Sequence, residues 1–204
     1  MIRPATGVAF TWSDDGDVRG DPDRRRAVGE ELGVGSEWAT VEQVHGADAV
    51  PVSRPGPAGR ADALVTTSHG LPVAVFTADC LGVVLRGEGG VGVAHAGWRG
   101  LVAGVLESAV SGLDEAGTPP LTAHIGPGIG PCCFEVGPEV AELFGEHTSL
   151  TSWGTTSVDL ASAAARRLDG LDVWVDDRCT RCGGGFSHRR DSTPHRMAAL
   201  GWVE

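Results

Sequence analysis

Short apolar runs separated by glycine dominate the middle of the chain. Three of them, at 72–77, 81–85 and 91–95, are rich in valine and show no alternation of polar and apolar positions. Continuous apolar runs of this length are typical of strands buried on both faces, whereas a strand with one wet face alternates. We therefore predict that these runs are strands buried on both faces.

Weaker strand signals surround these runs. The segment from Trp38 to His45 alternates in polarity and is followed by Gly46. A loop is expected from Ser53 to Arg60, because proline and glycine recur there. The other expected strands are at 8–12, 48–52, 61–67, 121–125, 171–175 and 196–203.

Four segments carry the signals of helices. Apolar residues recur at helical spacing between 101 and 113, which predicts a single helix from about Arg99 to Glu115. The segment 22–32 is expected to be a helix that ends at Gly33, since glycine commonly terminates helices. Two further helices are expected at 138–144 and 158–168.

Strands and helices are mixed along the chain without strict alternation, and some neighbouring strands resemble meanders. This order favours an α+β fold over a doubly wound one, with a mixed β-sheet core in layers and helices packed outside. Neither a repeat of fixed period nor a linker is visible, so residues 1–204 are expected to form a single domain.

The charge and composition restrict the possible partners and chemistry. A net charge of -11 argues against nucleic-acid and anionic-membrane partners, which attract basic patches. No apolar run approaches membrane-spanning length and the first residues lack a signal-peptide core, so a cytoplasmic protein is expected. The chain contains no lysine, asparagine or tyrosine. Schiff-base chemistry, a P-loop lysine and a Cys-His-Asn triad are therefore excluded, and anions must be bound by arginine or backbone N–H groups.

The main candidate functional residues are His45, Cys80 and His95, each at the expected end of a strand. One thiolate and two imidazoles make a three-ligand zinc site, and an open fourth position is typical of catalytic zinc. The same residues also allow a Cys80 nucleophile with His95 as base, a blue-copper site, or a structural thiol with two hydrogen-bonded histidines. Copper is disfavoured, because the only methionines are Met1 and Met197 and no loop supplies clustered ligands.

The other four cysteines carry a weaker signal. A total of five, an odd number, argues against a disulfide framework. Cys179 and Cys182 form half of a zinc-ribbon pattern, but the adjacent Cys132 and Cys133 look too constrained to supply the second half. We expect a structural or incidental role for the Cys-x-x-Cys pair, and small buried side chains at the adjacent pair.

Arginine is the cation available for binding an anionic substrate. Arg99 is at the expected helix start just after His95, and Arg189 with Arg190 lies in a glycine-rich segment that could reach the same cleft. We take Arg99 and Arg189 as candidate substrate-binding residues, with surface ion pairs as the alternative. No spacing marks a site among the remaining histidines, which are His69, His124, His147, His188 and His195.

Eight motifs occur in a fixed order and point to a known family. They are Val44-His-Gly46, Ala61-Asp-Ala-Leu-Val65, Thr77-Ala-Asp-Cys-Leu81, Ala94-His-Ala-Gly-Trp-Arg-Gly100, Ile125-Gly-Pro-Gly-Ile129, Phe134-Glu-Val-Gly137, Cys179-Thr-Arg-Cys182 and Phe186-Ser-His-Arg-Arg-Asp191. From about His45 to its C-terminus the chain resembles the YfiH-type family. Members of that family carry the names multicopper polyphenol oxidase (laccase domain), purine nucleoside phosphorylase and peptidoglycan editing factor. His188 and Phe134 stand where many members have tyrosine.

The resemblance implies a mixed-sheet α+β fold that has been likened to cysteine hydrolases, with a zinc ion held by His45, Cys80 and His95. It implies phosphorolysis of adenosine, inosine, guanosine and methylthioadenosine, with phosphate as second substrate, and adenosine deamination as a second activity. An amide hydrolase that uses Cys80 and His95 on cell-wall precursors is the competing class, and a zinc-stabilised binding protein is the non-enzyme alternative. The laccase name fits poorly, because such copper clusters need many paired histidines and this chain has seven scattered ones.

Overall fold

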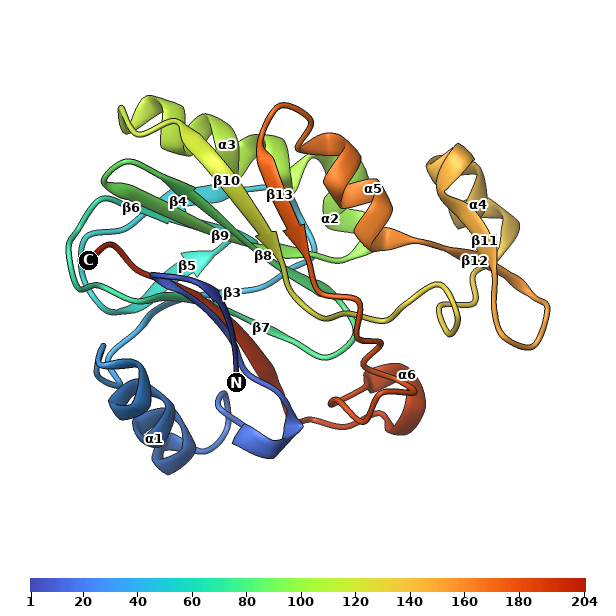
Figure 1. The fold of residues 1–204 in the computed structure, drawn as a ribbon, viewed down its shortest axis with the longest axis horizontal. Coiled ribbons are helices and arrows are strands. Elements are labelled where there is room, and N and C mark those ends of the chain that lie inside the picture. Colours follow the sequence, from blue (N-terminus) through green and yellow to red (C-terminus); the bar gives the residue numbers. More distant parts are fainter.

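Two six-stranded sheets form the centre of the structure, a computed structural model that describes residues 1–204 (Figure 1). The first sheet has the order β1 (Ile2–Ala5), β2 (Val8–Phe10), β14 (Met197–Gly201), β7 (Val73–Thr77), β3 (Ala39–Glu42) and β5 (Gly56–Arg60). The second has the order β13 (Asp172–Val175), β10 (Pro120–Ile125), β8 (Leu81–Gly87), β9 (Gly90–Ala96), β6 (Ala63–Thr66) and β4 (Ala49–Pro51). Both sheets mix parallel and antiparallel pairs, as the α+β prediction requires.

Helices cover the outer faces of the two sheets (Figure 1). The first sheet is covered by α1 (Pro22–Leu32), and the second by α2 (Trp98–Ala103), α3 (Val105–Glu115) and α5 (Leu160–Arg167). A lobe at the right of Figure 1 contains α4 (Pro138–Phe144), β11 (Thr148–Leu150) and β12 (Thr156–Val158). The short helix α6 (His188–Asp191) lies below it. None of the helices has the length and apolarity needed to cross a membrane.

Three apolar clusters fill the spaces between these layers. Along β7, Val73 and Val75 belong to the cluster between the sheets, whereas Ala74 and Phe76 belong to the cluster against α1. Strand β8 divides in the same way between the cluster shared by the sheets and the one beneath α3 and α5. Since side chains alternate across a strand, a strand covered on both faces needs apolar residues throughout. The prediction of doubly buried central strands is confirmed.

The helix predicted from Arg99 to Glu115 is interrupted, and this prediction is wrong. Gly104 adopts a left-handed conformation with φ of 94°, which ends α2 and begins α3. Glycine reaches this conformation without the steric penalty of a Cβ atom. Both helices still pack on β9, so the apolar spacing continues across the break and does not reveal it.

The loop predicted from Ser53 to Arg60 is also partly wrong, because Gly56–Arg60 forms β5 at the edge of the first sheet. It pairs in parallel with β3, and Pro57 stands opposite Thr40. Proline is tolerated in edge strands, where its missing N–H costs no ladder hydrogen bond. Composition therefore indicated a loop at a place where backbone pairing with a neighbour decides the structure.

Candidate active site

Three side chains that are distant in the sequence meet where the chain crosses between the two sheets. His45 follows β3, Cys80 lies in the turn between β7 and β8, and His95 is near the end of β9. Their ligand atoms lie within 4.8 Å of one another, and the Cys80 Sγ is 4.0 Å from the Nε2 of His45. His95 is buried, Cys80 is half-buried and His45 is exposed, so the group is open to solvent on one side.

Gly97 leaves the space that this group occupies. A Cβ atom at this position would lie 2.9 Å from the Cys80 Sγ and 3.3 Å from the Cδ2 of His45. Both distances are shorter than ordinary van der Waals contacts. Glycine is therefore needed here because the backbone before α2 approaches the thiol and the imidazole closely.

Asp62 holds two of the three side chains in place. Its fully buried carboxylate accepts N–H bonds from the backbone of Val44 at 3.1 Å, of His45 at 3.0 Å and of Gly46 at 2.6 Å. These bonds support His45 in a left-handed conformation, with φ of 60°, that side-chain-bearing residues rarely adopt. The carboxylate also lies 2.8 Å from the Nδ1 of His95, which leaves the Nε2 of that ring free for a ligand.

The metal-free group contains opposite charges near neutral pH. Burial alone would raise the pKa of the Cys80 thiol, but His45 and His95 outweigh it through hydrogen bonds and charge and lower this pKa to about 6. Burial would likewise lower the pKa of His95, whereas its bonds to Asp62 and Cys80 raise that pKa to about 9. A thiolate is the form that binds metals and attacks electrophiles, so Cys80 is prepared for either chemistry.

Asp79 anchors the turn that carries Cys80. It has a positive φ of 88°, and its buried carboxylate accepts the Thr180 hydroxyl at 2.7 Å and the Arg189 backbone N–H at 2.6 Å. Because Thr180 and Arg189 come from the segment before β14, these bonds join that segment to the thiol-bearing turn.

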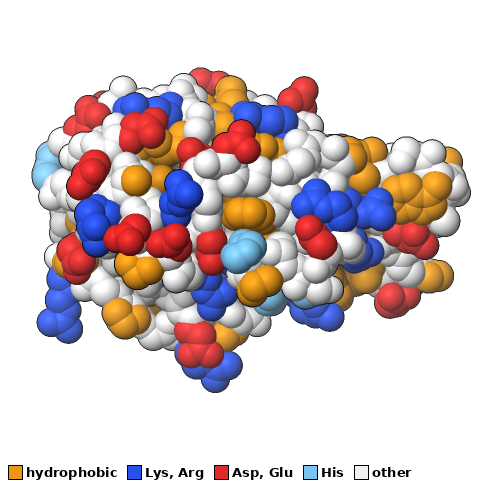
Figure 2. All heavy atoms as spheres, turned by 90° about the horizontal axis from the view of Figure 1, so that it is seen from below, with side chains coloured by type: hydrophobic (Ala, Val, Ile, Leu, Met, Phe, Trp, Pro, Cys, Tyr) orange, Lys and Arg blue, Asp and Glu red, His pale blue; other side chains and the backbone are white.

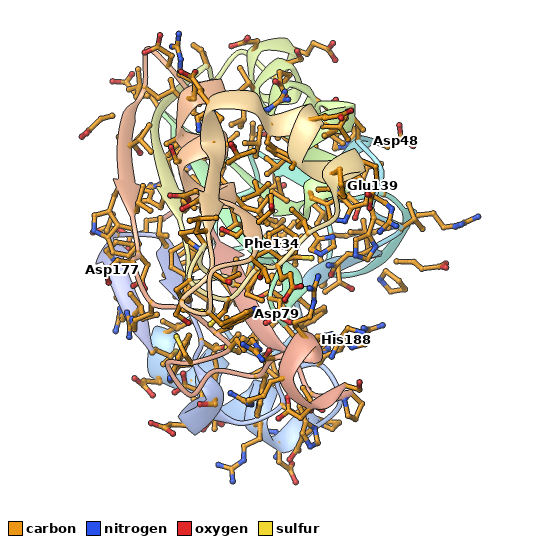
Figure 3. All side chains as sticks on the ribbon, turned by 90° about the vertical axis from the view of Figure 1, so that its right-hand side faces the viewer. Asp48, Asp79, Phe134, Glu139, Asp177 and His188 are labelled. Carbon is orange, nitrogen blue, oxygen red and sulfur yellow. The ribbon has the colours of Figure 1, made fainter.

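A cavity of about 430 Å³ opens over the three-residue group. Phe134, Asp79 and His188 all line this cavity, and in Figure 3 they lie near one another in the middle of the view, with Asp177 at its left edge. Its apolar walls come from Phe76, Ala78, Trp98, Ile129 and Phe134. This volume is within the range of about 300–1,000 Å³ typical of small-molecule sites.

Four arginines, Arg19, Arg99, Arg189 and Arg196, line the same cavity. The Arg99 guanidinium lies over the Trp98 ring, and that of Arg189 lies over the Phe134 ring and donates to a backbone carbonyl. Burial and, after it, the nearby Arg19 lower the pKa of Arg196, whose guanidinium donates to the backbone carbonyls of Thr193 and His195. Figure 2 shows arginine and acidic side chains side by side over the face seen there, so arginine is accompanied by acidic residues on that surface.

The arginines expected at the site, Arg99 and Arg189, both line the cavity, but Arg190 does not. Its guanidinium donates to the carbonyls of residues 180, 181 and 185 and so fastens a loop. Arg19, Arg196 and His188 also line the cavity, although the sequence marked none of them as a site residue. No local pattern distinguishes them. The segments that contain Arg19 and Arg196 come together only because β14 pairs between β2 and β7.

The remaining cysteines, which the sequence presents as two unrelated pairs, are brought together by the fold. Cys132, Cys133, Cys179 and Cys182 lie together, with all their sulfur atoms within 4.8 Å of one another. The adjacent pair points to one side in a turn, and the fold brings the Cys-x-x-Cys pair alongside it. None of these sulfur atoms lines the cavity described above.

Comparison with known proteins gives consistent matches over most of the chain. A family model described as multi-copper polyphenol oxidoreductase laccase matches residues 12–204. The purine nucleoside phosphorylase ORF3 of Streptomyces griseus is 42% identical over 182 residues, which are 80% of this chain and 73% of that protein. The purine nucleoside phosphorylase YfiH of Escherichia coli is 41% identical over 178 residues, which are 80% of this chain and 72% of that protein. The crystal structure of YlmD from Geobacillus stearothermophilus is similar with a TM-score of 0.82 at 32% identity, covering 92% of this chain and 82% of that one.

Proposed function

The chain belongs to the multi-copper polyphenol oxidoreductase laccase family, and from this premise we propose that it is a zinc-dependent purine nucleoside phosphorylase with adenosine deaminase activity. The names of its relatives support the phosphorylase part at the level of the family. The observation that carries the proposal is the placement of His45, Cys80 and His95 at a cavity lined by four arginines.

The donor set fits zinc better than copper. Two imidazoles and one thiolate are common zinc ligands, and three protein ligands leave the open position that catalytic zinc requires. A blue-copper centre adds a weak axial methionine, and no methionine lines the cavity. When bound, zinc would supply Lewis-acid activation of the group in its open position. The bond from His95 to Asp62 supports this assignment, since it fixes the ring tautomer as in many zinc sites.

The substrates that we propose are purine nucleosides and phosphate. Arginine forms strong charge-assisted bonds to phosphate oxygens, and the chain has no lysine to take this role. We assign phosphate to Arg19 and Arg196, two like charges near each other in the lining of the cavity, with Arg99 and Arg189 elsewhere in that lining. The purine would lie against the aromatic rings of Trp98 and Phe134, which line the same cavity.

We propose that phosphorolysis and deamination use the same three-residue group. The other cluster of possible metal ligands consists of four cysteines, and its sulfur atoms lie outside the cavity. Both activities should therefore fall together when Cys80 is replaced by alanine.

The test is product analysis of inosine and adenosine with and without phosphate. Inosine should give hypoxanthine and ribose 1-phosphate only when phosphate is present, because phosphate is the acceptor of the ribosyl group. Adenosine should give inosine without phosphate. Zinc-replete protein that performs neither reaction would refute the proposal.

A second candidate function has support from one observation. Cys80, His95 and Asp62 also form the arrangement of a cysteine hydrolase, with a thiolate, an imidazole and a carboxylate that orients the imidazole. An amide hydrolase acting on cell-wall precursors would need no metal, and an acyl-enzyme on Cys80 would be trapped with an amide or ester substrate. If the Cys80→Ala variant keeps its zinc at the active-site group and the wild type is acylated, the hydrolase is the correct function.

A further inference from the structure

Four of the five cysteines form a second cluster outside the cavity. Cys132 and Cys133 come from the loop after β10, and Cys179 and Cys182 from the segment after β13. The Cys132 Sγ is 3.6 Å from that of Cys133 and 3.8 Å from that of Cys182. All four sulfur atoms lie within 4.8 Å of one another, although 46 residues or more separate the two pairs in the sequence.

These separations are those of a metal site. A tetrahedral zinc site with Zn–S bonds of about 2.3 Å places its sulfur atoms about 3.8 Å apart. A disulfide needs its sulfur atoms at about 2.05 Å, and the measured distances are far longer. Since no pair is more than 4.8 Å apart, the widest separation exceeds the edge of the tetrahedron by at most about 1 Å, which small side-chain rotations would close.

The surroundings of the cluster also suit thiolates bound to a metal. Cys133 and Cys179 are buried in the core cluster beneath α5, and Cys182 closes the outer side. The backbone N–H of Gly130 donates to the Cys179 Sγ at 3.2 Å, and such outer bonds are typical of metal-bound groups.

We propose that Cys132, Cys133, Cys179 and Cys182 bind a second zinc ion, as a closed structural site with four thiolate ligands. Four thiolates favour a thiophilic ion with tetrahedral geometry, which zinc is, and they leave no open position for a substrate. The site shares no ligand with the proposed catalytic group.

The role of this site is to hold two walls of the cavity together. The loop after β10 supplies Ile129 and Phe134, and the segment after β13 supplies His188 and Arg189. The same segment supplies Thr180, which donates to the Asp79 carboxylate in the turn that carries the catalytic thiol. A metal ion between the loop and the segment fixes their separation, and so the width of the cavity.

The test begins with the Cys80→Ala variant, purified with zinc and a reductant. It lacks one ligand of the catalytic group, so the zinc that remains belongs to the cysteine cluster. We expect about one zinc ion per chain, with X-ray absorption showing four sulfur neighbours at about 2.3 Å. A nitrogen-containing shell in that variant, or no bound zinc together with four free titratable thiols, would overturn the proposal.

A reciprocal variant guards against misfolding and against a disulfide. Cys182→Ser changes the exposed member of the cluster, so the core cysteines stay in place. It should lose the sulfur-only zinc, keep zinc with mixed sulfur and nitrogen ligands, and exchange backbone amides faster at 126–137 and 179–192. Unchanged zinc content and exchange would contradict the proposal, as would peptide mapping of a disulfide within the cluster of the wild-type protein. Neither measurement uses nucleoside turnover, so failure of the proposed function would be recognised separately.

Discussion

Asp62 provides a direct test of how the fold prepares the candidate metal-binding group of His45, Cys80 and His95. Each of its carboxylate oxygens accepts two N–H groups: Oδ1 from His45 and His95, and Oδ2 from Val44 and Gly46. In the Asp62→Asn variant one oxygen becomes an NH₂ group of nearly the same size. If the NH₂ group replaces Oδ2, the partly buried N–H groups of Val44 and Gly46 lose their acceptor; if it replaces Oδ1, the N–H of His45 and the buried ring of His95 do.

The magnitude of the loss follows from that count. A fully buried donor left without its acceptor costs about 1–3 kcal/mol, and since most of these donors are only partly buried, the pair should lower the free energy of unfolding by about 1–3 kcal/mol in total. Zinc affinity should fall about 10- to 100-fold, because the His95 ring loses the partner that fixes its tautomer and the left-handed His45 loses its support.

The assay is urea unfolding of the metal-free protein, together with zinc competition against a chromophoric chelator. The matched control is Asp15→Asn, which removes a carboxylate that accepts the Trp12 backbone N–H at 2.7 Å and pairs with the N-terminal ammonium, at a residue that does not line the cavity. The control should lose some stability and keep its zinc affinity. An Asp62→Asn protein that binds zinc as tightly as the wild type would refute the assignment of a supporting role to this carboxylate.

Further predictions concern the same site. Gly97→Ala should weaken zinc binding measured by calorimetry, since its Cβ would lie 2.9 Å from the Cys80 sulfur, whereas Gly46→Ala, with nothing closer than 3.6 Å, should not. In metal-free protein the alkylation rate of Cys80 should rise through pH about 6; a midpoint near that of a free thiol would contradict this. The lowered pKa of Cys80 contributes a free energy of unfolding that grows as the pH rises from about 6 to 9. The raised pKa of His95 contributes a free energy of unfolding that is fully present below 6.5 and is lost as the pH rises to about 9. The free energy of unfolding should therefore change little across this window in the wild type and fall with pH in Cys80→Ala. Arg196→Gln should raise the KM for phosphate about tenfold and leave the KM for inosine unchanged. An equal rise in both KM values would contradict the assignment of phosphate to Arg196.

Much of the fold follows from local patterns. The continuous apolar runs before Cys80 and His95 require strands covered on both faces, and the structure contains them as β7, β8 and β9. The helix at Pro22–Leu32 has the predicted bounds, because Asp21 caps its start and Gly33 takes the left-handed conformation at its end. The positions of His45, Cys80 and His95 at strand ends were likewise sufficient to nominate them together.

Other features depend on contacts between distant segments, which no local pattern records. Asp62 is one acidic residue among many until strand pairing places four N–H groups around its carboxylate. Arg19 and Arg196 reach the cavity only because β14 pairs between β2 and β7.

The cysteines show the same division between sequence and tertiary structure. From the sequence, Cys132 and Cys133 are neighbours too constrained to act together, and Cys179 with Cys182 is half of a motif. The fold makes one cluster of the four, because β10 and β13 run in parallel and their following loops leave the sheet side by side. The sequence by itself determines which segments form strands and which candidate ligands stand at their ends, since that information is local. The distances between ligand atoms are set only when the sheets pair and pack, because they depend on residues far apart in the chain.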